Sequence, residues 1–135
     1  MDRNAFFLLL LAGVTHACIF MTSYKVQADN ALVVSKTCDP RGIPQGSQFW
    51  GHLGFLLEEL TANAPYTPQL YFKTRIGGEY APAFGEAHCQ PYCSPSSCEA
   101  CLRQLSMDIW GICNNALGAH VEYGDCGIHY ECFYF

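Results

Sequence analysis

Cysteine is the residue type in this chain with the widest range of possible chemistry, and 9 of the 135 residues are Cys. Cysteines pair as disulfides, bind zinc as thiolates or carry out redox chemistry. The spacing Cys98-Glu99-Ala100-Cys101 resembles the motif of thioredoxin-like oxidoreductases, but the hydrophobic strand and βαβ context are missing, and Cys89 offers Cys98 another partner. Zinc held by Cys98, Cys101 and His88 is a further alternative. We favour structural disulfides and expect no enzyme, no metal and no cofactor.

The N-terminus has the pattern of a secretory signal peptide. Arg3 precedes an apolar stretch over residues 5–21, and the small residues Val26 and Ala28 stand at the −3 and −1 positions of a cleavage site. An uncleaved membrane anchor is the rival, but polar residues and a glycine interrupt the stretch, which is short for a bilayer. We therefore predict a signal peptide over residues 1–28 and a secreted, extracellular domain over residues 29–135.

An exported chain meets oxidising conditions, which let its thiols pair. Cys18 leaves with the signal peptide, and the remaining cysteines are even in number, but about 105 pairings are open to them. Only 7 Lys and Arg stand against 12 Asp and Glu, and they are scattered. Nucleic-acid binding needs clustered positive charge, so we expect no nucleic-acid partner, and no membrane partner after signal cleavage.

Hydrophobic periodicity predicts two helices and five strands in the order strand, helix, two strands, helix, two strands. Ser94 and Pro95 form a capping residue and a first helical position, so the second helix is expected to begin there. The predicted strands cover residues 31–34, 70–75, 80–88, 119–123 and 127–135, and the first helix follows Ser47, a possible N-cap, and ends at Asn63. This order predicts an α+β domain with both helices on one face of an antiparallel sheet. The aromatic residues 133–135 are expected to complete its core.

The last two strands are expected to place His120 and Glu131 on one face of the sheet. Gly124-Asp125 is a natural reversal between them. A two-residue loop would put His120 opposite His129 and leave Glu131 as a diagonal neighbour, whereas a four-residue loop would put His120 opposite Glu131. Both registers leave the two side chains within reach of one ligand.

Several motifs, taken together, resemble the ginkbilobin-like antifungal domain of plant cysteine-rich secretory proteins. They include the spacing of Cys89, Cys98 and Cys101, the stretch Ile112-Cys113-Asn114-Asn115, Cys38 with Ile43-Pro44, Tyr71-Phe72-Lys73-Thr74, Gly118-Ala119 and Tyr130-Glu131. The resemblance implies a protein secreted to the plant apoplast. Its implied fold has two helices on a five-stranded antiparallel sheet, with bridges Cys38–Cys113, Cys89–Cys98 and Cys101–Cys126. Cys93 and Cys132 lie outside this set, and we expect them to form a fourth bridge.

The resemblance also implies mannose binding and action against fungi, through an Asn, an Arg and a Glu at positions that here hold Asp39, His120 and Glu131. Only the glutamate is retained. Because a histidine changes charge near pH about 6.5, we expect mannose affinity mainly in mildly acidic fluid. The expected partner is mannose or mannan of the fungal cell wall. The alternative is an extracellular protein-interaction or structural module that has lost sugar binding.

Overall fold

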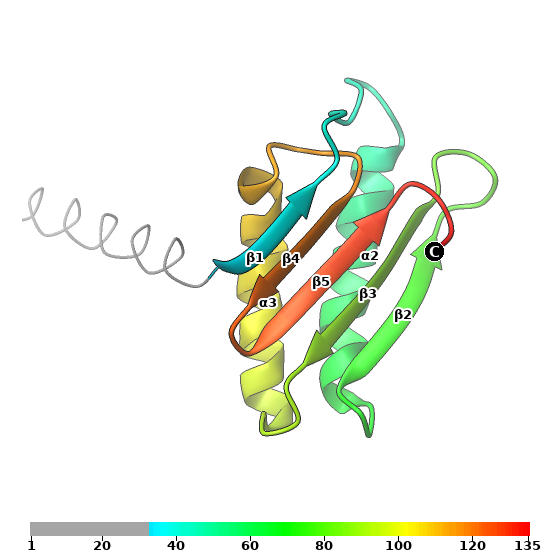
Figure 1. The fold of residues 1–135 in the computed structure, drawn as a ribbon. Coiled ribbons are helices and arrows are strands. Elements are labelled where there is room, and N and C mark those ends of the chain that lie inside the picture. Colours follow the sequence, from blue (N-terminus) through cyan, green and yellow to red (C-terminus); the bar gives the residue numbers. More distant parts are fainter. Residues whose placement is uncertain (1–32) are drawn as a thin grey trace, which may run out of the picture. The chain divides into compact units, whose positions relative to one another are not determined.

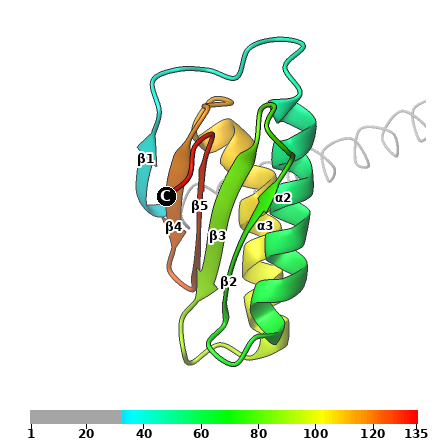
Figure 2. The ribbon, with the colours of Figure 1, turned by 90° about the vertical axis from the view of Figure 1, so that its right-hand side faces the viewer.

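The computed structural model of the chain describes residues 33–135. Its elements are β1 (Val33–Cys38), α2 (Phe49–Asn63), a 3-10 turn (Ala64–Tyr66), β2 (Tyr71–Ile76), β3 (Ala83–Cys89), α3 (Pro95–Ile112), β4 (Ala119–Tyr123) and β5 (Cys126–Glu131). The strands form one antiparallel sheet in the order β1-β4-β5-β3-β2. Both helices cover the same face of it (Figures 1 and 2). The predicted α+β fold is confirmed, whereas the predicted signal peptide lies outside the described residues.

The second predicted helix begins where its capping signal stands. The Ser94 side chain accepts from the backbone N–H of Ser97, whose own side chain accepts from the backbone N–H of Ser94, and Pro95 occupies the first turn. The first helix begins one residue later than predicted. Ser47 Oγ accepts the N–H of Phe49, and Gln48 stands at the cap position without a side-chain bond.

The core lies between the helices and the face of the sheet that they cover, which we call the inner face. Its largest fully buried side chains are Phe49, Leu53, Leu56, Leu60, Leu102, Leu105, Ile109, Val121, Ile128 and Tyr130. Tyr130 is satisfied there because its hydroxyl donates to the Ala116 carbonyl at 2.7 Å. Within residues 33–135 no helix is long and apolar enough to cross a membrane.

The last strand ends at Glu131, earlier than predicted, and the residues after it do not complete the core. Phe133 and Tyr134 are exposed. The chain turns back over the uncovered side of the sheet, which we call the outer face, where the Phe135 ring lies 4.1 Å from the His129 ring and Tyr134 meets Phe84 edge-on. The two helices cover the inner face of the sheet and complete the core, so the terminal aromatic residues lie outside it.

Three disulfides join the sheet to the helical layer: Cys38–Cys113, Cys89–Cys98 and Cys101–Cys126. The fourth predicted bridge is wrong, because Cys93 and Cys132 are both free. Cys93 lies beside Asp125 at the start of β5, with Sγ 3.7 Å from that carbonyl, whereas Cys132 follows the end of β5. The six residues of β5 separate the two positions by about 20 Å, far beyond disulfide reach.

Candidate functional site

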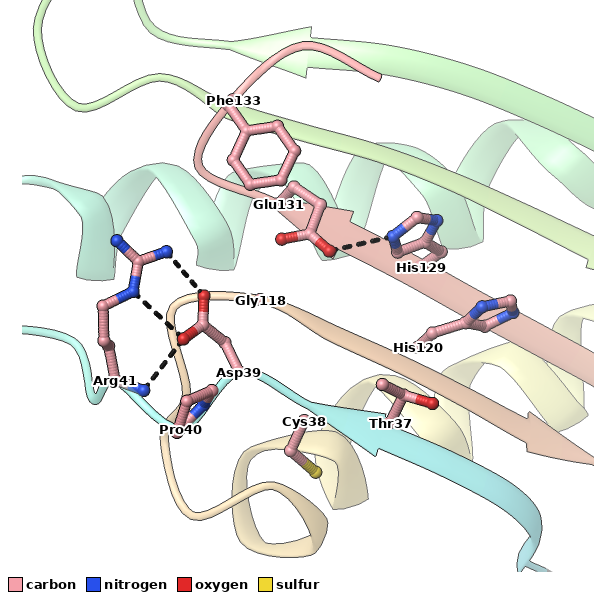
Figure 3. A pocket seen from close by; sticks show the side chains of 10 residues that line it. All are labelled: Thr37, Cys38, Asp39, Pro40, Arg41, Gly118, His120, His129, Glu131 and Phe133. Carbon is pink, nitrogen blue, oxygen red and sulfur yellow. Dashed lines mark hydrogen bonds and ion pairs between the residues drawn. The ribbon is translucent and has the colours of Figure 1, made fainter.

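A pocket of about 630 Å³ opens where the end of β1 meets the start of β4 and the end of β5. Its lining residues are Thr37, Cys38, Asp39, Pro40, Arg41, Gly118, His120, His129, Glu131 and Phe133 (Figure 3). The volume is within the range of small-molecule sites. The three residues that the sequence put forward as a binding site, Asp39, His120 and Glu131, therefore line one pocket.

Strand register brings the β4 and β5 side chains to this place. His120 pairs with His129, so the hairpin has the two-residue loop and Glu131 is the diagonal neighbour of His120. The pairing of Thr37 with His120 adds β1 to the same row. Because side chains alternate along a strand, these residues all lie on the outer face.

Asp39 is held beside β4 by backbone contacts and by a covalent bond. Its N–H donates to the Gly118 carbonyl at 2.8 Å, and the preceding residue forms the Cys38–Cys113 disulfide. Glycine is also needed at position 118, because a Cβ there would lie 2.1 Å from Glu131 Oε2. The missing side chain leaves the space that the Glu131 carboxylate occupies.

Glu131 is fixed by a histidine on its own strand. Its Oε1 lies 3.1 Å from His129 Nε2, and the other nitrogen of that ring, Nδ1, lies 3.7 Å from Glu86 Oε1 on β3. The His129 ring also stacks on His120, with centroids 4.8 Å apart. The second oxygen of Glu131 is left for another donor.

His120 also belongs to a chain of polar contacts that crosses the outer face. Its Nε2 lies 2.8 Å from Glu122 Oε1, and Glu122 Oε2 lies 3.1 Å from His88 Nε2 on β3. Glu122 reaches across β5 because Gly127 has no Cβ, which would lie 2.1 Å from Oε2. The contacts align His120 at the edge of the pocket.

Sequence reasoning missed Arg41, the one Lys or Arg among the lining residues of the described chain. Asp39 Oδ1 accepts from the backbone N–H of Arg41 at 2.8 Å and from its Nε at 3.1 Å, and Oδ2 accepts from Nη2 at 2.7 Å. The guanidinium holds the pKa of the Asp39 carboxyl below its ordinary value. An Asp followed two residues later by Arg, with Pro40 turning the chain between them, was the available signal.

The pocket thus combines a guanidinium, two carboxylates, imidazole rings and the exposed ring of Phe133. Carboxylates accept hydrogen bonds, guanidinium donates them, and an aromatic ring offers an apolar surface. This set suits a small ligand rich in hydroxyl groups, which needs directional donors and acceptors beside an apolar contact.

Residues 36–132 match a family model described as "Salt stress response/antifungal". The antifungal protein ginkbilobin-like protein of Picea abies is 43% identical over 105 residues, which cover 77% of this chain and 96% of that protein. The antifungal protein ginkbilobin-2 of Ginkgo biloba is 39% identical over 132 residues, covering 97% and 95% of the two chains.

Among solved structures, the fold resembles the tandem DUF26 ectodomain of the Arabidopsis thaliana cysteine-rich receptor-like protein PDLP5, with a TM-score of 0.69 and 18% identity. The match covers 77% of this chain and 51% of the ectodomain, so the chain spans about half its length. At this identity the likeness shows the fold alone. The family match and the close relatives show more: the chain belongs to the salt stress response/antifungal family, together with the ginkbilobin-like antifungal proteins.

Proposed function

We propose that this chain is a secreted, extracellular antifungal protein that binds mannose, or mannan of the fungal cell wall, in the pocket between β1, β4 and β5. The observation that carries the proposal is the convergence of Asp39, His120 and Glu131, which are far apart in the sequence, on one pocket. Membership of a family whose relatives are named antifungal supports the defence role.

Glu131 is the acceptor on which we expect a sugar to depend most. His129 takes up one of its oxygens, and the other lies over Gly118 beside the pocket. A carboxylate oxygen accepts strongly from a hydroxyl group, because the bond is charge-assisted. Phe133, half exposed at the rim, offers a flat apolar surface for the C–H face of a hexose.

His120 makes the proposed binding dependent on pH. The groups that face it are Glu122 on its own strand and His129 on the next, with Thr37 paired to it from β1. A charged imidazole donates through both nitrogens, whereas a neutral one keeps a single donor. Mannose should therefore bind more tightly at pH 5.5 than at pH 8.

The second candidate is an extracellular protein-interaction or structural module without sugar binding. Asp39 is largely engaged by Arg41, which leaves little of it for a ligand. This engagement of Asp39 favours the module over a lectin.

A glycan array that includes yeast mannan, read at pH 5.5 and pH 8, separates the two candidates. The wild-type chain should bind mannan and Glu131→Ala should not, while Glu79→Ala, an exposed carboxylate in the turn between β2 and β3, serves as the matched control. Mannan binding that is absent at both pH values would contradict the sugar-binding function. Equal mannan binding at both pH values would contradict only the pH-dependent role of His120 and would leave the sugar-binding function standing.

A further inference from the structure

We propose that Arg41 contacts the sugar directly and that Asp39 is a positioning residue that holds the Arg41 guanidinium at the pocket. This inference rests on the proposed function and deepens it. It reassigns Asp39, one of the three residues that the sequence put forward as ligand contacts, and it adds a residue that the sequence did not put forward.

Accessibility separates the two partners. The Asp39 side chain is 13% exposed, whereas the Arg41 side chain is 64% exposed. The Oδ1 atom of Asp39 already accepts two hydrogen bonds and Oδ2 accepts a third, all from Arg41. A carboxylate oxygen has about two acceptor sites, so Asp39 keeps little capacity for a ligand. Arg41 is the member of the pair that a ligand can reach.

Arg41 retains the donors that a sugar needs. A guanidinium has five N–H groups in a rigid fork. Bonding to Asp39 uses Nε and one proton of Nη2, so the second proton of Nη2 and both protons of Nη1 stay free. The double contact with Asp39 restricts the side chain in advance, which lowers the entropy that is lost when a ligand binds.

The opposite side of the pocket supplies the matching acceptor. In Figure 3, Glu131 lies between His129 on one side and the Asp39–Arg41 pair on the other. A hexose in the pocket can accept from Arg41 through one hydroxyl group and donate to Glu131 through another, because both side chains line the same pocket. Asp39 and Arg41 offset each other's charge, which leaves Glu131 as the unpaired formal charge when the histidines are neutral. The site therefore favours a neutral hexose over a sugar that bears a carboxylate.

The test is calorimetric titration of mannose into the mature chain and its variants. A parallel titration with glucuronate, which bears a carboxylate, should show weaker binding than mannose. Arg41→Gln should weaken mannose binding about 10- to 100-fold, the range for a lost hydrogen bond to a charged donor. Arg41→Lys should also weaken it, because the charge stays but the fork is lost. Arg103→Gln is the matched control, since Arg103 on α3 is 63% exposed and bonded to Glu99 at 2.7 Å, much as Arg41 is to Asp39.

Asp39→Asn separates positioning from contact. It should weaken mannose binding less than Arg41→Gln does, and it should have no further effect when both changes are combined, because Asp39 then has no guanidinium to hold. Additive losses in the double variant would overturn the positioning role of Asp39. Unchanged mannose affinity in Arg41→Gln would overturn the contact by Arg41 while leaving the proposed function intact. Failure of the wild-type chain to bind mannose would overturn both.

Discussion

The two faces of the sheet carry opposite chemistry although they belong to the same strands. On β4 and β5 the inward side chains Val121, Ile128 and Tyr130 are fully buried under the helices. Their outward neighbours are histidines and glutamates, which contact one another along each strand and across to β3, and some of them line the pocket. A step of one residue along the chain thus separates side chains that fill the core from side chains at the pocket. Substitutions on the inner face should alter folding, and substitutions on the outer face should alter binding.

The Cys38–Cys113 disulfide is the place where this separation should fail. It ties β1, whose side chains are mostly exposed, to the end of α3, and it precedes Asp39. Replacing both cysteines by Ala should lower the free energy of unfolding by about 4.5 kcal/mol, because the bridge closes a loop of 75 residues. It should also weaken mannose binding. Chemical denaturation and calorimetry measure the two effects.

The bridge Cys89–Cys98 provides the control for that prediction, since it closes a loop of only 9 residues far from the pocket. Its removal should lower the free energy of unfolding by about 2.6 kcal/mol and leave mannose affinity unchanged in the folded fraction. Equal effects of the two removals on binding would show that β1 does not need its covalent bond to hold the pocket.

A pair of neighbouring substitutions sharpens the comparison between the faces. Ile128→Ala on the inner face should lower the free energy of unfolding by about 3 kcal/mol, because Ile128 is fully buried in the core. The next residue, His129, has its side chain on the outer face. His129→Ala should change the free energy of unfolding by less than about 1 kcal/mol but weaken mannose binding, since His129 fixes Glu131. Urea denaturation of both variants gives the values. A larger loss of stability in His129→Ala than in Ile128→Ala would contradict the assignment of stability to the inner face.

Gly118→Ala tests the outer face without removing a polar side chain. The added Cβ would lie 2.1 Å from Glu131 Oε2, so the carboxylate must move. The flexible end of Glu131 can shift, and stability should change little, but mannose affinity should fall about tenfold, or about 1.4 kcal/mol. Gly124→Ala is the control, because a Cβ there meets no atom within 4 Å. Full affinity in Gly118→Ala would show that the position of Glu131 is not needed.

The smallest effect is expected at acid pH. Arg41 lowers the pKa of Asp39 in the folded chain, so the unfolded chain binds the proton more readily. The pair therefore stabilises the fold above the ordinary carboxyl pKa near 3.8, and this contribution is lost as the pH falls through the lowered value. Asp39→Asn should flatten the pH dependence of the unfolding midpoint below about pH 4. An unchanged slope would contradict the pairing of Asp39 with Arg41.

Local signals in the sequence predicted much of the fold. Ser94 and Pro95 marked the start of α3 because a capping box depends on residues only three apart. The Gly124-Asp125 loop set the register of β4 and β5, so the shared face of His120 and Glu131 followed from alternation. The three disulfides came from resemblance to a family, because an even number of cysteines does not specify pairs.

The errors arose where three-dimensional distance decided the outcome. Cys93 and Cys132 were paired by elimination, but they stand at opposite ends of β5. The residues after Glu131 have core-like side chains, yet the helices had already filled the inner face. Arg41 was missed because its part in the pocket depends on a loop that returns it to Asp39, which no periodicity encodes.

The central claim is that a hexose binds on the outer face at the pocket formed by β1, β4 and β5. The most direct measurement is a nuclear magnetic resonance titration with mannose that follows the Arg41 Nε–H signal and the imidazole rings of His120 and His129. We predict saturable shifts in these three signals and none in the methyl groups of Leu105 beneath the inner face. A second, smaller hollow lies on α2 and is lined by Gly51, Gly54, Phe55 and Glu58. Shifts confined to that hollow, or saturation without change at Arg41 and His120, would contradict the account.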